Sequence, residues 1–85
     1  MQEKEIYILL ADDDEDDRLF FTDALDELKL KTKVKTFNDG VALMNYLNDK
    51  SNLLPNILFL DLNMPKKSGV ECLSEIKKDD YFKDI

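Results

Sequence analysis

The sequence predicts an α/β domain in which a parallel sheet is covered by helices. Short apolar runs alternate with amphipathic stretches three times along the chain, and acidic residues directly follow two of these runs. Such alternation is typical of parallel sheets, because parallel neighbours must be joined by a crossover helix. With 85 residues, 44% of them hydrophobic, the chain suits one small globular domain over residues 1–85.

The first unit begins with the apolar run Ile6 to Ala11, which predicts a strand buried on both faces. The run ends at six consecutive acidic residues, Asp12 to Asp17. Apolar residues then recur at helical spacing: Leu19, Phe20, Phe21, Ala24, Leu25 and Leu28. A helix therefore follows the acidic turn, since acidic side chains are favourable at a helix N-terminus.

The second unit begins with Lys33 to Phe37, which alternates and is rich in valine and threonine. This pattern predicts a half-covered strand near the edge of the sheet. A turn at 38–40 leads into a second predicted helix, whose apolar residues are Val41, Leu43, Met44, Tyr46 and Leu47.

The third unit contains the run Ile57 to Leu60, again predicted to be a strand buried on both faces, and it places Asp61 at its carboxyl end. A loop over 63–69 follows. The third predicted helix carries Val70, Leu73 and Ile76, and Asp79 to Ile85 is predicted to be a loop.

Three carboxylates are expected to meet at one edge of this sheet. Asp12 and Asp13 follow the first strand and Asp61 follows the third, and ligands of open α/β sheets bind outside the carboxyl ends of the strands. Two carboxylates about 4 Å apart repel by about 4 kcal/mol at an effective dielectric of about 20. A divalent cation such as magnesium would compensate this repulsion, because it prefers oxygen ligands.

The motif Ala11-Asp12-Asp13, followed later by Asp61-Leu62-Asn63-Met64-Pro65 and Gly69, resembles the receiver domains of two-component response regulators over essentially the whole chain. The resemblance implies that Asp61 accepts a phosphoryl group. It also implies a Mg²⁺ (or other divalent cation) site in which Asp13 binds directly and Asp12 through water. Asp61 and the backbone carbonyl of Asn63 would complete this site.

The resemblance further implies a regulatory domain that takes part in its own phosphorylation and is otherwise no enzyme. The expected donor is the phosphohistidine of a histidine kinase or phosphotransfer protein, or a small phosphodonor, and the chain itself contains no histidine. A carboxylate can act as the nucleophile of such a transfer.

The implied fold is flavodoxin-like, with strand order 2-1-3-4-5 in the complete family. This chain resembles the first three of five units, so a parallel sheet of order 2-1-3 is expected. The last two units, which supply a Ser or Thr and a Lys to the site, are absent; Lys66 and Lys67 are not assigned to that role. The edge of the 57–60 strand would be open, which predicts a homodimer, strand exchange, or a fragment of a longer product.

Two other functions remain open. A receiver-derived interaction module would dimerise without switching. A haloacid-dehalogenase-like phosphatase would use Asp12 as nucleophile and Asp14 as general acid. The motif of that family has Thr or Val at the position of Asp16, and this interpretation leaves the motif at residues 61–65 unexplained.

An EF-hand is disfavoured by two positions of its loop. Asp12, Asp14 and Asp16 alternate as its calcium ligands would, yet Asp17 stands where glycine is needed and Asp23 where glutamate is usual. The acids at 14–17 are better interpreted as helix-capping and surface residues.

Composition excludes several classes of partner. Twelve basic and nineteen acidic residues give a net charge of -7, which opposes direct binding of nucleic acid. No apolar segment approaches the roughly 20 residues of a membrane span. The single cysteine, Cys72, cannot form an internal disulfide, and the start Met-Gln-Glu-Lys-Glu lacks the features of a secretory leader, so a cytoplasmic protein is expected.

Overall fold

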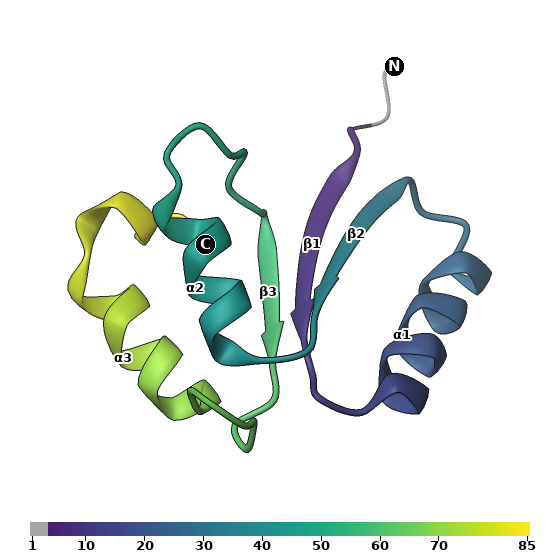
Figure 1. The fold of residues 1–85 in the computed structure, drawn as a ribbon. Helices are drawn as coiled ribbons and strands as arrows, with labels where there is room; N and C mark the ends of the chain where they lie inside the picture. Colours follow the sequence, from purple (N-terminus) through teal and green to yellow (C-terminus); the bar gives the residue numbers. More distant parts are fainter. Residues whose placement is uncertain (1–3) are drawn as a thin grey trace.

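The computed structural model describes residues 4–85 (Figure 1). The first three residues, part of the stretch from which we expect no secretory leader, lie outside the described residues. Helices, strands and one 3-10 turn follow in the order β1 (Ile6–Ala11), α1 (Glu15–Glu27), β2 (Thr32–Phe37), α2 (Gly40–Asn48), β3 (Ile57–Leu60), α3 (Gly69–Lys78) and η1 (Asp80–Phe82). Among the described residues, none of the helices is both long and apolar enough to cross a bilayer.

The three strands form one parallel sheet of order β2-β1-β3, as predicted. Ala11, the last residue of β1, lies opposite Phe37 of β2 and Leu60 of β3. The carboxyl ends of the strands therefore share one rim of the sheet. Helix α1 covers one face, and α2 and α3 cover the other (Figure 1).

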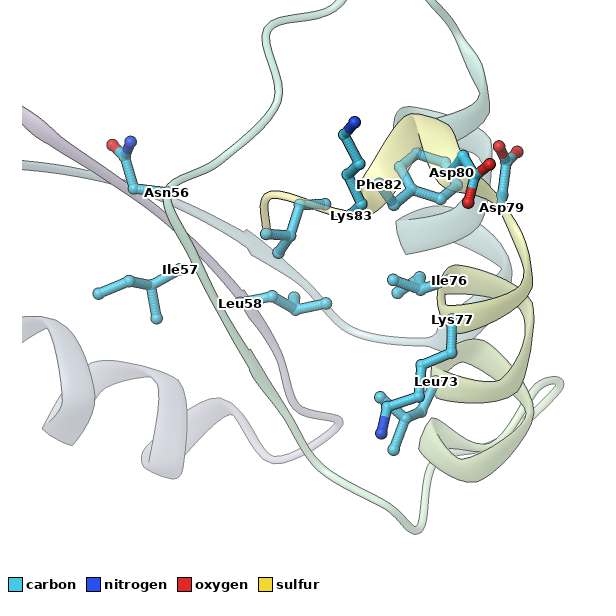
Figure 2. Close-up of a pocket in the computed structure, with 11 residues that line it drawn as sticks. Asn56, Ile57, Leu58, Leu73, Ile76, Lys77, Asp79, Asp80, Phe82 and Lys83 are labelled. Atoms are coloured by element: carbon cyan, nitrogen blue, oxygen red, sulfur yellow. The ribbon is translucent and has the colours of Figure 1, made fainter.

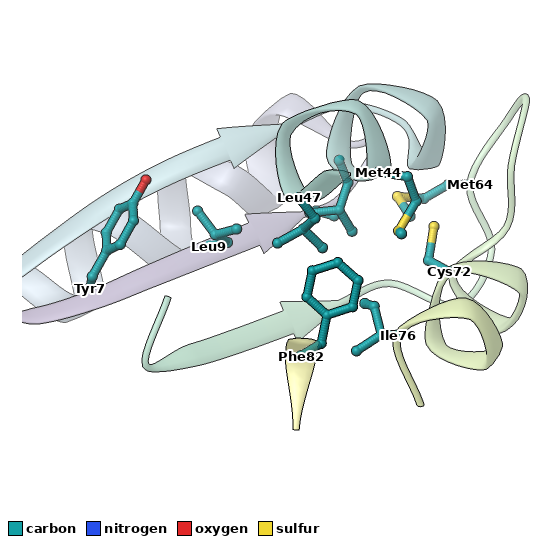
Figure 3. Packing of buried hydrophobic residues seen from close by; sticks show 10 residues of the cluster. Tyr7, Leu9, Met44, Leu47, Met64, Cys72, Ile76 and Phe82 are labelled. Atoms are coloured by element: carbon teal, nitrogen blue, oxygen red, sulfur yellow. The ribbon is translucent and has the colours of Figure 1, made fainter. Parts of the chain in front are cut away.

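The main core lies between the sheet and the pair α2 and α3 (Figure 3). Alternate residues of β1 face it because successive side chains of a strand point to opposite faces. Its other members come from α2, α3, η1 and the loop before α3: Leu43, Met44, Leu47, Cys72, Ile76, Phe82 and Met64. Burying one such aliphatic or aromatic side chain stabilises the fold by about 1.5 to 3 kcal/mol.

Helix α1 packs more loosely than its apolar residues predict. Ile8 and Leu10 of β1 are buried outside the main core cluster, yet α1 itself has no fully buried residue. Phe20 is 72% exposed, and Leu19 and Leu28 are also exposed. The reason is geometric: among the described residues, α1 is the one helix on its face of the sheet, so its flanks pack against no second helix (Figure 1).

Two other expectations are wrong. Strand β3 is not buried on both faces: Ile57 and Phe59 point to the face of α1 and remain 42% and 43% exposed, whereas Leu58 and Leu60 point to the core. The segment 79–85 is not simply a loop. It forms η1, and Phe82 is buried in the core, so its apolar side chain anchors this segment against α3.

Candidate functional site

Three carboxylates converge at the rim where β1 and β3 end. Asp12 and Asp13 directly follow β1, and Asp61 directly follows β3. One side-chain oxygen from each lies within 4.8 Å of the others. Asp12 and Asp61 are half-buried and Asp13 is exposed. The predicted convergence of acids that are distant in sequence is therefore confirmed.

The main chain fixes the position of these acids. The amide of Asp12 donates to the carbonyl of Phe37 at 3.0 Å, which ties the end of β1 to β2. The amide of Asp61 donates to the carbonyl of Ala11 at 2.9 Å, which ties the end of β3 to β1. Both carboxylates thus extend from backbone that is hydrogen-bonded to the adjacent strand.

Similar local turns follow Asp12 and Asp61. The Oδ1 atom of Asp12 accepts from the amide of Asp14 at 2.9 Å, and the Oδ1 atom of Asp61 accepts from the amide of Asn63 at 3.0 Å. Such turns are typical of aspartate at a change of chain direction. Since a carboxylate has two oxygens with several lone pairs, each side chain keeps acceptor capacity for a cation.

The donor set fits a hard divalent cation. Carboxylate oxygens are the ligands that magnesium and calcium prefer, and magnesium usually takes one or two carboxylates together with water. Asp13 is exposed and is the most accessible of the three carboxylates. The amide of Asn63 donates to the side chain of Asp61, and this hydrogen bond keeps Asn63 beside Asp61 in the loop. A cation here would offset the mutual repulsion of the three acids.

The acids after Asp13 differ in role. Asp14 is the N-cap of α1 and accepts from the amides of Asp16 and Asp17, which confirms the capping interpretation for Asp14. Asp17 instead lines a cavity with Asp12 and Asp61, which the sequence interpretation missed. The sequence carries no local signal for this placement, because it depends on how α1 lies over β3.

Electrostatic repulsion acts on Asp17. Its pKa is raised above the ordinary value of an aspartate, chiefly by the negative charge of Asp14, then by desolvation and by the charges of Asp12 and Asp61. Protonation of the Asp17 carboxylate, or the approach of a cation to it, is therefore favoured.

The two lysines of the loop after β3 have other partners. Lys66 lies 3.5 Å from Asp39, the N-cap of α2, and Lys67 pairs with Glu75 of α3. The hydrogen bond from the Ala42 amide, together with the charge of Lys66, lowers the pKa of Asp39. These pairings support leaving both lysines out of the phosphoacceptor site.

Comparisons with known proteins agree with this geometry. The family model described as the response regulator receiver domain matches residues 8–85. The chain is 34% identical over 82 residues to response regulator Rcp1 of Synechocystis sp., covering 92% of this chain and 56% of Rcp1. It is 31% identical over 81 residues to a probable methanogenesis regulatory protein, FilR2, of Methanothrix harundinacea, covering 92% and 52%. The chain thus spans about half the length of these curated relatives.

Solved structures give the same result. The Mn²⁺-bound form of Rcp1 matches with a TM-score of 0.87 and 33% identity, covering 92% of this chain and 59% of that one. The phosphorylated cyanobacterial phytochrome response regulator RcpA matches with a TM-score of 0.85 and 36% identity, covering 94% and 60%. Because the family model covers nearly the whole sequence and the fold is shared, this chain belongs to the response regulator receiver domain family.

Proposed function

We propose that this chain is the phosphoacceptor part of a two-component response regulator, with Asp61 as the residue that receives the phosphoryl group. The observation that carries the proposal is the meeting of Asp12, Asp13 and Asp61 within 4.8 Å at the rim of a receiver sheet. Relatives support it, since one has been solved with Mn²⁺ and another in a phosphorylated form.

The proposed reaction uses the chain's own carboxylates. An oxygen of Asp61 attacks the phosphorus, an acyl phosphate forms, and the bond from phosphorus to the donor breaks with its electron pair leaving on the donor. Asp13 would hold a divalent cation directly and Asp12 through water, with Asp61 and the backbone carbonyl of Asn63 as further ligands. The cation would neutralise the charge of about -1.5 to -2 that the phosphoryl group adds beside the acids.

The proposed donor is a histidine kinase or a phosphotransfer protein. The donor histidine lies outside residues 1–85, because these residues include no histidine. The chain would act in the cytoplasm as a regulatory domain that is modified once, and not as an enzyme that turns over many substrates.

Intact mass after incubation with a small phosphodonor and Mg²⁺ tests the assignment. The unaltered chain should gain the mass of one phosphoryl group, and Asp61→Asn should gain none, because an amide cannot act as the attacking carboxylate. Asp23→Asn is a matched control: it removes a charge from the exposed surface of α1, away from the rim, and should leave labelling intact.

Chelation of the cation should suppress labelling of the unaltered chain. Labelling of Asp61→Asn to the same extent would contradict the assignment of Asp61. Repeated hydrolysis of a generic phosphate ester by the unaltered chain would instead favour the phosphatase alternative.

We also propose that two copies associate through the open edge of β3, either by pairing or by strand exchange. Residues Ile57–Leu60 carry no charge, whereas Lys31, Lys33 and Lys35 occur in and beside the other edge strand, β2. Charged residues, lysine especially, protect an edge strand from pairing with another chain. The β2 edge is protected in this way and the β3 edge is not.

A groove beside β3 supports this second proposal. It has a volume of about 570 Å³ and lies between β3 and the segment α3 to η1 (Figure 2). Leu58, Leu73, Ile76 and Phe82 contribute apolar side chains to it. A strand added at the β3 edge could therefore bury its own apolar side chains in the groove as well as pair its backbone.

A further inference from the structure

A basic strip runs along β2, the strand at the edge of the sheet beside β1 (Figure 1). Residues 28–38 contain four lysines and no acidic residue, although the whole chain has a net charge of -7. The four lysines are exposed and occur at every second position: Lys29, Lys31, Lys33 and Lys35. Within residues 4–85 the ion pairs are formed by Lys66 and Lys67, so no described carboxylate lies within ion-pairing distance of the strip.

Two of these lysines are held over aromatic rings. The ammonium of Lys33 lies 5.5 Å from the centre of the Tyr7 ring, and that of Lys35 lies 5.6 Å from the centre of the Tyr46 ring. The two tyrosine hydroxyls are hydrogen-bonded to each other, and that of Tyr46 also donates to the carbonyl of Leu53 at 2.9 Å. Cations are attracted to the faces of aromatic rings. Both ammonium groups are therefore positioned on the α2 side of β2 before any partner binds.

The outer backbone of β2 is available for a further strand. The carbonyl of Phe37 accepts from the amide of Asp12 at 3.0 Å, so the odd-numbered residues of β2 direct their backbone groups toward β1. Because this direction alternates along a strand, Thr32, Val34 and Thr36 direct their amides and carbonyls outward. In the strand order 2-1-3-4-5 of the complete fold β2 stays the outermost strand, so this edge does not depend on where the present sequence ends.

The spacing of the lysines matches an extended acidic segment. Side chains two residues apart in a strand point to the same face and lie about 6.6 Å apart. An added strand with an acidic residue at every second position would bring carboxylates beside successive lysines, and opposite charges on adjacent strands attract. An uncharged strand would leave the lysines without partners, and a basic strand would be repelled. The strip therefore excludes most strands, as lysine does at other sheet edges, and admits an acidic one.

We propose that the β2 edge binds an acidic, extended segment of a partner protein, which adds to the sheet as a strand beside β2. Its carboxylates would lie beside Lys33 and Lys35, and its backbone would pair with the outward groups of β2. Charges more than about 8 Å apart are largely screened at physiological ionic strength, so the local lysines outweigh the net charge of the chain. Pairing through backbone amides and carbonyls favours a polypeptide, because a nucleic acid cannot form a strand ladder.

Fluorescence anisotropy with a labelled peptide of alternating glutamate and valine tests the proposal. The unaltered chain should bind this peptide, and binding should weaken as salt rises. The double substitution of Lys33→Gln and Lys35→Gln should raise the Kd about three- to thirtyfold, the range expected when two cross-strand charge pairs are lost. Absence of binding by the unaltered chain, or an unchanged Kd in the variant, would overturn the proposal.

The matched control combines Lys77→Gln and Lys78→Gln. It removes the same charge from two exposed residues in the last turn of α3. The Kd for the peptide should stay close to that of the unaltered chain. An equal rise of the Kd in both double variants would show that only the total charge matters, and the β2 site would be rejected.

Two further probes separate strand addition from attraction of any polyanion. A peptide with the same side chains and methylated backbone nitrogens keeps the charge but has no amide donors. It should bind about tenfold more weakly, because several backbone hydrogen bonds are lost. A single-stranded oligonucleotide of equal charge should also bind much more weakly than the first peptide. Equal affinity for either probe would refute recognition of an added strand.

Hydrogen exchange locates the bound peptide in the unaltered chain without any substitution. The amides of Thr32, Val34 and Thr36 point away from β1, so their exchange should slow when the peptide of alternating glutamate and valine is added. Protection that appears on α1 or β3 instead, with none on β2, would place the peptide elsewhere and contradict the proposed site.

Discussion

Gly69 lies directly against the main chain of Asp61. A Cβ atom at Gly69 would overlap the carbonyl oxygen of Asp61 and would lie 2.7 Å from the Cα of Leu62. The amide of Gly69 also donates to the carbonyl of Leu62 at 3.1 Å. The first turn of α3 can approach the proposed phosphoacceptor this closely only because residue 69 has no side chain.

Gly69→Ala should therefore destabilise the fold and slow phosphorylation. In a helix alanine is normally more favourable than glycine by about 1 kcal/mol, but overlap with backbone typically costs about 1 to 3 kcal/mol, and backbone cannot rotate away as a side chain can. We expect a lower free energy of unfolding in urea and a lower labelling rate at Asp61.

Val70→Ala is the control for this substitution, because Val70 is the next residue of α3 and is 58% exposed. It should change neither quantity appreciably. A Gly69→Ala chain as stable and as reactive as the unaltered chain would show that the Asp61 backbone can shift without cost.

At the residue scale the sequence predicts most of the acidic rim. Asp12, Asp13 and Asp61 each stand just beyond an apolar run, and in a parallel sheet such positions share an edge. The cavity position of Asp17 was not predicted. It depends on how α1 lies over Phe59 of β3, and no local pattern encodes that long-range packing.

The start of α3 is held by a capping box. The side-chain oxygen of Ser68 accepts from the Glu71 amide at 3.1 Å, and the Glu71 carboxylate accepts from the Ser68 amide at 3.2 Å. This reciprocal pair satisfies two backbone donors at the helix end. It also fixes the end of the loop that leads from Asp61 into α3.

Ser68→Ala should lower the free energy of unfolding by about 1 kcal/mol, the usual cost of losing an N-cap side chain. The urea midpoint should fall while the slope of the transition is unchanged, because the exposed surface of the unfolded chain is the same. Ser68→Thr retains a capping hydroxyl and should recover most of the loss.

Ser74→Ala gives the matched control within the same helix, since Ser74 is exposed in the middle of α3. It should leave the urea midpoint unchanged or raise it slightly, because alanine is the better helix former. Equal destabilisation by both substitutions would contradict a specific capping role for Ser68.

At the scale of elements, periodicity predicted the order and the type of every main helix and strand. It failed where burial depends on neighbours. The run 57–60 is as apolar as a central strand, yet Ile57 and Phe59 are over 40% exposed, because α1 covers their face of the sheet only loosely. Phe82 is buried although charged residues flank it in the sequence, because its ring lies beside Leu47 of α2 and Ile76 of α3 in the core (Figure 3).

At the scale of the whole molecule, the two edges of the sheet differ in chemistry. Three lysines occur in and beside β2, whereas β3 exposes uncharged apolar residues next to the groove formed with α3 and η1. The net charge of -7 opposes association in general, so pairing requires a local surface that outweighs it. We propose that the β3 edge supplies this surface.

The edge proposal predicts a dimer that a single charge disrupts. Light scattering after size exclusion should give the mass of two chains for the unaltered protein at high concentration. Ile57→Lys should give a folded monomer, because Ile57 is already 42% exposed and a lysine on an edge strand resists pairing. Leu53→Lys places the same charge on a loop residue that is 69% exposed and should leave the dimer intact. A folded, unaltered chain that stays monomeric at high concentration would contradict pairing through β3. The unpaired backbone of β3 and the groove beside it would then have no measurable affinity for a second copy of the chain.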